Sequence, residues 1–175
     1  MTPETLLLVI DMQAKLLPHI DGGAAVLKNC ATLVKAADLL SIPALFTEQN
    51  PRGLGATVDD LAVEGHHSVI EKDTFDATLS AEFVAALPSK RTLLLVAGCE
   101  AHVCVLLTVT GLRRLGYAVE VIADAIGSRA PENKAAALAR AQSEQAFPVA
   151  TETVIFRWLE SCRHPQFRSA LALIK

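Results

Sequence analysis

The sequence predicts an α/β fold, a three-layer α/β/α sandwich with a six-stranded, mainly parallel, doubly wound sheet. Short apolar runs alternate with longer segments of helical period, which is typical of βαβ units. The runs are almost entirely apolar, as expected for strands that helices cover on both faces. No composition shift, long Gly/Ser stretch or internal repeat divides the 175 residues, so residues 1–175 are expected to form a single domain.

Six short apolar runs are the expected strands. They cover residues 6–10, 44–47, 68–70, 92–97, 119–123 and 149–151. Between the first two runs, residues 23–40 repeat apolar side chains at helical spacing, which predicts a long helix. Residues 131–146 are rich in alanine and place a proline in a first-turn position, which predicts another. A third helix is expected to begin at Cys104 and to end near Gly116.

Composition restricts the class of protein. Hydrophobic residues make up 51% of the chain and charged residues 20%, which indicates a well-filled core and argues against disorder. The net charge is -3 with both signs scattered along the chain, so no basic face is available for nucleic acid. Aromatic residues, at 5%, leave little for base stacking. We therefore expect a globular protein that does not bind nucleic acid.

The apolar segments and the N-terminus predict a cytoplasmic protein without membrane association. The longest apolar runs, such as residues 92–99, are far shorter than the about 20 residues that span a bilayer. The N-terminus lacks the basic segment and the cleavage site of a signal peptide. The four cysteines show no C-x-x-C spacing in a chain rich in apolar residues, and we expect them to be reduced thiols.

Chemically capable residues follow three of the expected strands. Asp11 ends the first strand, Lys72 ends the third, and the segment 98–104 follows the fourth. In doubly wound sheets, ligands bind beyond the carboxyl ends of the strands, near the point where the strand order reverses. The sequence therefore predicts a functional site at this rim of the sheet.

Cys104 stands where a helix is expected to begin. Unpaired N–H groups and the helix dipole favour a thiolate at that position, and a nearby Lys72 ammonium would lower the pKa of the thiol further. The same N–H groups can stabilise an oxyanion. From position alone, a buried core cysteine is an equally good interpretation. An activated Cys104 would be the fastest thiol in the chain to react with iodoacetamide.

Asp11 and Lys72 distinguish these interpretations. A carboxylate at the tip of a buried strand costs free energy unless it is paired or hydrogen-bonded, although Asp also commonly ends strands as a cap or loop residue. Lysines after strands are usually solvated, so a functional role for Lys72 depends on its meeting Asp11 and Cys104. Together these three supply a nucleophile, a proton acceptor and a cation, the parts needed for acyl transfer through a thioester.

Four motifs carry a resemblance to a known family. They are Leu-Val-Ile-Asp-Met-Gln at 8–13, Thr-Glu-Gln-Asn-Pro-Arg-Gly-Leu-Gly at 47–55, Lys-Asp-Thr-Phe at 72–75 and Gly-Cys-Glu-Ala-His-Val-Cys-Val at 98–105. With these motifs and their spacing, the chain resembles the isochorismatase-like cysteine hydrolases over nearly its full length. Residues 117–129 and 154–167 are most similar to the isochorismatase-domain-containing protein subgroup. The resemblance implies the Rossmann-like fold of that family.

The resemblance implies a role for each matching catalytic position. It makes Cys104 the nucleophile, and it makes Asp11 the base that takes the proton of the thiol. Lys72 becomes the cation that supports the thiolate. All three residue types match those of the family at these positions.

The resemblance also implies how the pocket is built. The family has a non-proline cis peptide bond just before the nucleophile loop, which here would join Cys99 to Glu100. The backbone N–H groups of Glu100 and Cys104 would then form an oxyanion hole. Gln13 and Phe75 would line the substrate-binding pocket.

No metal site is expected. The nicotinamidase branch of the family binds a metal through an Asp-x-His cluster after the second strand, whereas this chain has Gln-Asn-Pro-Arg-Gly-Leu-Gly at 49–55. His66 and His67 are adjacent, so in an extended strand they face opposite ways, and a solvated loop pair is the favoured interpretation. We therefore expect neither a metal nor another cofactor, and we do not expect nicotinamide as the substrate.

Other histidines, cysteines and aromatic residues receive structural interpretations. A loop or pocket-wall position is favoured for His102 over a role as a base. Cys30 and Cys162 lie on apolar helical faces and are expected to be core thiols, and Cys99 is expected near the site without reacting. The apolar stretch around Trp158 either packs on the core or closes a dimer.

The expected function is hydrolysis of a small amide, or of an ester- or ether-like bond, through a covalent Cys104 intermediate. The expected partners are a small-molecule substrate and further copies of the chain, as a dimer or tetramer. A catalytically silent domain that binds a small molecule or a protein is the alternative. A nucleotide-binding domain is disfavoured because no G-x-G-x-x-G or G-x-x-x-x-G-K-[ST] follows the first strand.

Overall fold

A single six-stranded sheet organises the protein. The computed structural model describes residues 4–61, 67–90 and 92–175. Its strands are β1 (Thr5–Ile10), β2 (Ala44–Gln49), β3 (Ser68–Lys72), β4 (Leu93–Cys99), β5 (Ala118–Gly127) and β6 (Phe147–Val149). They are parallel in every pair and lie in the order β3-β2-β1-β4-β5-β6. The strand order therefore reverses between β1 and β4, which is where open α/β sheets bind ligands.

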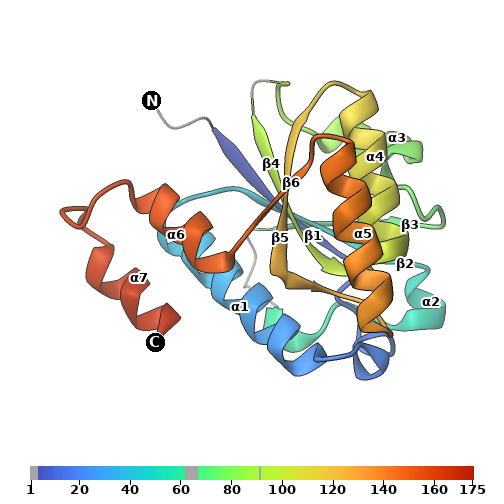
Figure 1. Ribbon diagram of the computed structural model, residues 1–175, viewed down its shortest axis with the longest axis horizontal. Coiled ribbons are helices and arrows are strands. Elements are labelled where there is room, and N and C mark those ends of the chain that lie inside the picture. The colour runs from blue at the N-terminus through green and yellow to red at the C-terminus, as the bar shows by residue number, and fades with distance from the viewer. Residues whose placement is uncertain (1–3, 62–66, 91) are drawn as a thin grey trace.

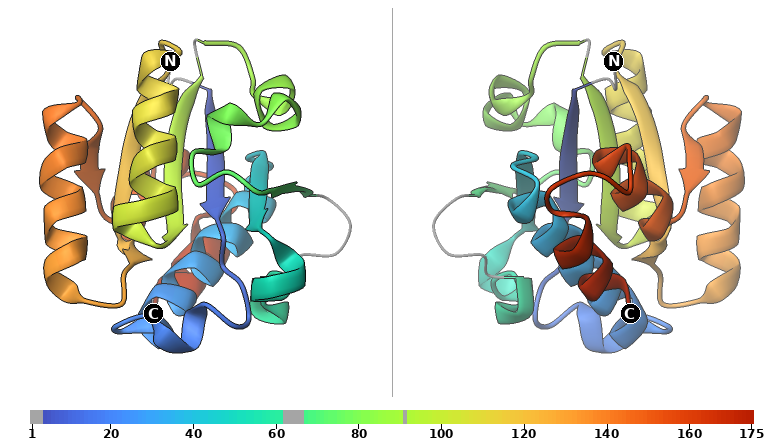
Figure 2. Two further views of the ribbon diagram at one scale, coloured as in Figure 1. Left: turned by 90° about the vertical axis from the view of Figure 1, so that its right-hand side faces the viewer. Right: turned by 90° about the vertical axis from the view of Figure 1, so that its left-hand side faces the viewer.

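Helices cover both faces of the sheet, which confirms the three-layer α/β/α fold (Figures 1 and 2). One face carries α1 (Gly23–Leu39), α6 (Thr151–Leu159) and α7 (Phe167–Ile174), and the other carries α3 (Ala81–Ala86), α4 (Leu106–Arg114) and α5 (Pro131–Ser143). The short elements are α2 (Pro51–Leu54), the 3-10 turns η1 (Leu17–His19), η2 (Asp59–Leu61) and η3 (Ala77–Leu79), and the π-helical turn η4 (Ala101–Val105). Among the described helices, none combines the length and the apolar character needed to cross a membrane.

The hydrophobic core lies in two layers because successive side chains of a strand point to opposite faces. Leu7 and Val9 belong to the layer under α1, whereas Leu8 and Ile10 belong to the layer under α4. Every residue of β1 and β4 is buried. These central strands need apolar side chains on both faces, which explains why their sequences read as continuous apolar runs.

The last strand differs from the sequence-based expectation. β6 occupies Phe147–Val149, two residues before the predicted run at 149–151. Thr151 instead begins α6, and both its backbone N–H and its hydroxyl donate to the carboxylate of Asp124, at 2.8 and 2.9 Å. Because the helix start is fixed by this contact with β5, the strand must end earlier. Val149 and Thr151, which suggested one strand, thus belong to β6 and α6, respectively.

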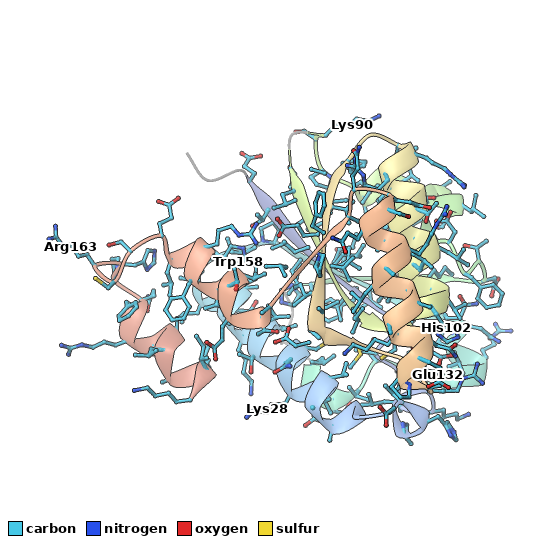
Figure 3. All side chains as sticks on the ribbon, in the orientation of Figure 1. Lys28, Lys90, His102, Glu132, Trp158 and Arg163 are labelled. Carbon is cyan, nitrogen blue, oxygen red and sulfur yellow. The ribbon has the colours of Figure 1, made fainter. Side chains whose placement is uncertain are left out.

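The C-terminal apolar stretch packs on the core. Trp158 lies in α6, and its indole N–H donates to the hydroxyl of Thr5 at 3.0 Å (Figure 3). Ile155 and Leu159 are also buried, while Phe156 is exposed and contacts Phe167 of α7. The sequence left open whether the stretch around Trp158 packs on the core or closes a dimer, and in the structure Trp158 packs on the core.

Gly98 allows the two central strands to meet at the switch point. It has φ = +114°, and an added Cβ atom would overlap the backbone of Ile10 in β1. The β4–β5 register also shifts between Val96 and Gly98, which marks a bulge at the same place. Both the conformation and the close approach require a residue without a side chain.

We predict that Gly98→Ala destabilises the protein by about 2 to 5 kcal/mol, since it combines backbone strain with a steric clash in the core. Gly116→Ala is the matched control: Gly116 also has positive φ, +89°, but the nearest atom to an added Cβ lies 3.9 Å away. The control should lose only about 1 kcal/mol. Urea unfolding measures both values, and equal losses in the two variants would contradict the role of the close approach.

Candidate active site

The structure brings Asp11, Lys72 and Cys104 together at the carboxyl end of the sheet. Asp11 follows β1 directly, Lys72 is the last residue of β3, and Cys104 lies in η4 after β4. The Lys72 ammonium nitrogen lies 2.7 Å from Asp11 Oδ2, and both side chains are fully buried. The buried Cys104 thiol lines the same cavity as Asp11 and lies within electrostatic reach of its carboxylate. The carboxylate therefore interacts with both the cation and the thiol.

Two polar residues of β2 each form a hydrogen bond with one member of the Asp11–Lys72 ion pair. β2 separates β1 from β3 in the sheet, so Lys72 must reach across it. The Thr47 hydroxyl donates to Asp11 Oδ1 at 2.6 Å, and the Lys72 ammonium donates to Gln49 Oε1 at 2.9 Å. Sequence reasoning missed both residues. The available signal was the pair of polar side chains at positions i and i+2 of a strand, which share one face.

The backbone at Asp11 has an uncommon conformation. Its φ is +50°, and its N–H donates to the carbonyl oxygen of Thr47 at 3.1 Å. Asp tolerates the left-handed region better than most residues, and non-glycine residues in this region occur often at functional sites. The turn that ends β1 is thus fixed by a contact with β2, the same strand that holds the side chain.

Cys104 lies in a π-helical turn that continues into α4. The carbonyl oxygen of Glu100 accepts hydrogen bonds from the N–H groups of Val103 and Val105, at 3.0 and 3.2 Å. The preceding peptide bond, Cys99–Glu100, is cis, as the family resemblance implies. Single π-helical turns occur frequently at functional sites. The nucleophile expected from the sequence therefore sits just before α4 and not at its first residue.

The Cys104 thiol is protonated at neutral pH, contrary to the expectation of a thiolate. Burial, the largest cause, and the negative charge of Asp11 raise the pKa of Cys104 to about 12, and the charge of Lys72 lowers this pKa by less than Asp11 raises it. The physical reason is that the Lys72 ammonium is already ion-paired with Asp11, which leaves little positive potential for the sulfur. The resting state thus holds a neutral thiol beside a carboxylate.

A cavity of about 480 Å³ opens beside the thiol. Apolar residues of its wall are Leu16, Leu54, Phe75 and Val103, and the other lining residues are Asp11, Lys15, His19, Gln49, Glu100, Cys104 and Arg129. Phe75 lines the cavity with 56% of its surface exposed. The volume of the cavity lies in the range of small-molecule sites. Sequence reasoning did not identify Lys15, His19 and Arg129, because exposed loop residues carry no distinctive pattern.

Gln13 supports the site from behind, and the expectation that it lines the pocket is wrong. Its side chain is fully buried, and its Nε2 donates to the carbonyl oxygens of Gln49 at 3.1 Å and Gly55 at 2.6 Å. Its Oε1 accepts from the N–H of Gln49 at 2.8 Å. Two of these hydrogen bonds hold Gln49 at the end of β2 and the third holds Gly55, so Gln13 acts by positioning the residue that contacts Lys72.

His102 and His67 both make specific contacts. His102 Nδ1 lies 3.0 Å from the Ser128 hydroxyl, at the end of the molecule where α5 begins (Figure 3). His67 Nε2 lies 2.8 Å from the Asp38 carboxylate, and its ring packs against Phe46, so its interpretation as a solvated loop residue is wrong. His66 lies outside the described residues. In the described part of the chain, no three His, Cys, Asp or Glu side chains converge as a metal site would require.

The other three cysteines are unpaired. Cys30 and Cys99 are buried, and burial raises the pKa of Cys99 to about 12. Cys162 is exposed, which corrects its interpretation as a core thiol. The reason is that α6 ends at Leu159, where Glu160 adopts φ = +57°, so Cys162 lies in the turn beyond the helix.

We predict that Lys72→Met destabilises the protein by about 3 to 5 kcal/mol, because it leaves the Asp11 carboxylate buried without its counter-ion. The double variant Asp11→Leu/Lys72→Met is the control. It removes both charges, so no buried charge is left without a partner. The double variant should therefore be more stable than Lys72→Met alone. Urea unfolding of the wild type and the two variants measures the difference, and a double variant no more stable than Lys72→Met would contradict the coupling.

We also predict that iodoacetamide at pH 7.5 modifies the exposed Cys162 well before Cys104. The thiolate is the nucleophile, so the Cys104 rate should rise about tenfold for each pH unit below its raised pKa. Asp11→Asn removes the charge that raises this pKa and should accelerate the reaction. Peptide mass spectrometry measures each site, and preferential modification of Cys104 at pH 7.5 would contradict a protonated resting thiol.

Comparisons with known proteins identify the family of the chain. Residues 5–153 match the Isochorismatase domain family. Isochorismatase domain-containing protein 2 of Danio rerio is 32% identical, with 99% of this chain and 88% of the relative covered. The MAR1 ribonuclease of Caenorhabditis elegans is 30% identical in sequence, and its structure matches with a TM-score of 0.92. The match covers 99% of this chain and 91% of that chain.

A more distant structure has the same fold. The Escherichia coli protein YcaC, described as an octameric hydrolase of unknown specificity, is 23% identical and has a TM-score of 0.87, with 98% of this chain and 85% of that chain covered. The family domain extends over most of the chain, and the curated relative is similar over nearly all of it. The chain belongs to the isochorismatase family.

Proposed function

We propose that this protein hydrolyses a small amide, or an ester- or ether-like metabolite, through a covalent Cys104 intermediate and without a metal. One observation carries the proposal: a buried thiol lies beside a carboxylate, which is ion-paired with an ammonium, at a cavity of small-molecule size. This arrangement provides a nucleophile with an adjacent base, and the base has a third group that orients it.

In the proposed first step, Cys104 Sγ attacks the carbonyl carbon of the substrate while Asp11 accepts the thiol proton. Attack in step with proton transfer suits a thiol whose raised pKa keeps it protonated until the substrate is bound. The carbonyl oxygen becomes an oxyanion, which we assign to the backbone N–H groups of Glu100 and Cys104. Lys72 keeps the carboxylate in place and balances its charge.

In the second half of the reaction, the tetrahedral intermediate collapses and the bond to the leaving nitrogen breaks. Asp11 returns its proton to the departing amine, and a thioester with Cys104 remains. Water then attacks the thioester as Asp11 accepts a proton from it. The C–S bond breaks, Asp11 reprotonates the sulfur, and the carboxylic acid product leaves.

The proposed setting is cytoplasmic, because the mechanism needs a reduced thiol and all four cysteines are unpaired. We further propose that the chain acts as one domain and assembles into a homo-oligomer, a dimer or a tetramer. The E. coli structural neighbour is described as an octamer. Phe75, Leu79, Val84 and Leu107 leave apolar surface exposed on and beside η3, α3 and α4, which an interface between copies would bury.

We predict that p-nitrophenyl acetate acetylates Cys104 and releases one equivalent of nitrophenolate in a burst. Cys104→Ala should abolish the burst, and Asp11→Asn should slow it about 100-fold or more because the base is lost. Cys162→Ala removes an exposed thiol that has no part in the proposed reaction, and this variant should keep the full burst. Intact-protein and peptide mass spectrometry locate the acetyl group, and a chelator should not change the rate.

A panel of small amides, with RNA included because the C. elegans relative is described as a ribonuclease, then identifies the substrate class. Turnover of an amide that depends on Cys104 supports the proposal. Acetylation of Cys162 alone, or an intact Cys104 that reacts with no member of the panel, would instead favour the catalytically silent binding domain.

A further inference from the structure

The charges around the cavity do not cancel. Asp11 is paired with Lys72, and the Glu100 carboxylate is paired with Arg129 at 3.0 Å. Lys15 also lines the cavity, and in the described parts of the chain no carboxylate forms an ion pair with it. The rim therefore carries a surplus of positive charge, in a protein whose overall charge is negative. A cation without a counter-ion in a small cleft favours ligands of the opposite sign.

Arg129 is held in a fixed orientation. Its backbone N–H and its side-chain Nε both donate to the same oxygen of Glu100, each at 3.0 Å. The Glu100 side chain is only 10% exposed, whereas that of Arg129 is 64% exposed. Within residues 4–61, 67–90 and 92–175, the two terminal guanidinium nitrogens have no hydrogen-bond acceptor. A planar guanidinium with its terminal N–H groups free is suited to bind a carboxylate through two parallel hydrogen bonds.

The loops that carry these cations are tied together. The N–H of Asp21 donates to the carbonyl oxygen of Ser128 at 2.9 Å, which joins the segment after η1 to the residue before Arg129. On the other side, the N–H of Lys15 donates to the carbonyl oxygen of Leu54 at 3.0 Å. His19, from the same segment as Lys15, also lines the cavity. Three residues that can be cationic are thus presented from fixed backbones to one small cavity.

We propose that Arg129, with Lys15 and His19, forms a carboxylate-binding subsite, and that the substrate is a small amide bearing a carboxylate on an apolar body. The body would lie against Leu16 and Phe75, and the amide would reach Cys104. As a statement about substrate class this rests on the proposed function, but the binding of carboxylates to the rim does not depend on turnover. Preorganised charged donors of this kind discriminate a charged ligand from its neutral isostere.

The test measures binding in Cys104→Ala, which cannot turn over, with benzoate and its neutral isostere benzamide as probes. Calorimetry should show benzoate binding about tenfold tighter or more, in line with a charge-assisted hydrogen-bond pair. Arg129→Gln and Lys15→Gln, each in the Cys104→Ala background, should weaken benzoate about three- to tenfold and change benzamide less than twofold. Lys15→Gln serves as the second variant because it leaves the Glu100–Arg129 contact intact.

Lys90→Gln is the control for nonspecific attraction, since Lys90 lies at the opposite end of the molecule from His102 (Figure 3). It should leave both affinities unchanged. Equal affinity for benzoate and benzamide, or a loss of benzoate binding as large in Lys90→Gln as in Arg129→Gln, would overturn the proposal. Because no chemistry occurs in these proteins, such a failure is separate from a failure of Cys104 acetylation in the wild type.

Discussion

The ion pair between Asp11 and Lys72 is the interaction on which the rest of the site depends. Both side chains are fully buried, and the effective cost of removing each charge from water is several kcal/mol. The pair is tolerated because Thr47 and Gln49 supply further hydrogen bonds. These four side chains come from the ends of three strands, so the pair can form only when β1, β2 and β3 are all in register.

The same pair explains the character of the thiol. A free ammonium beside Cys104 would stabilise a thiolate, but here the ammonium is held by a carboxylate, and burial dominates the pKa of the sulfur. The enzyme that we propose therefore keeps its nucleophile protonated until the substrate occupies the cavity. Such a nucleophile is protected from the alkylation and oxidation that affect low-pKa thiols.

The central part of the fold was predictable because burial on both faces of a parallel sheet demands continuous apolar runs. β1 and β4 show this constraint, and the position of Asp11 and Cys104 after them followed directly. The edge was less predictable: β6 is only three residues long, and a side-chain contact from β5 sets where α6 begins. Gln13 was assigned to the pocket because of the family resemblance, but its amide satisfies backbone groups of Gln49 at the end of β2 and of Gly55, which no local pattern indicates.

The position of Lys72 in the sheet has a consequence for how activity and stability are linked. β3 is an edge strand, and three of its five residues are exposed, yet its last residue carries the cation that holds Asp11 in the centre. Edge elements with few buried contacts are the first to open in local unfolding. Opening of β3 alone would withdraw the ammonium while β1 and β4 remained paired, so local unfolding at this edge would remove activity in a chain that is otherwise folded.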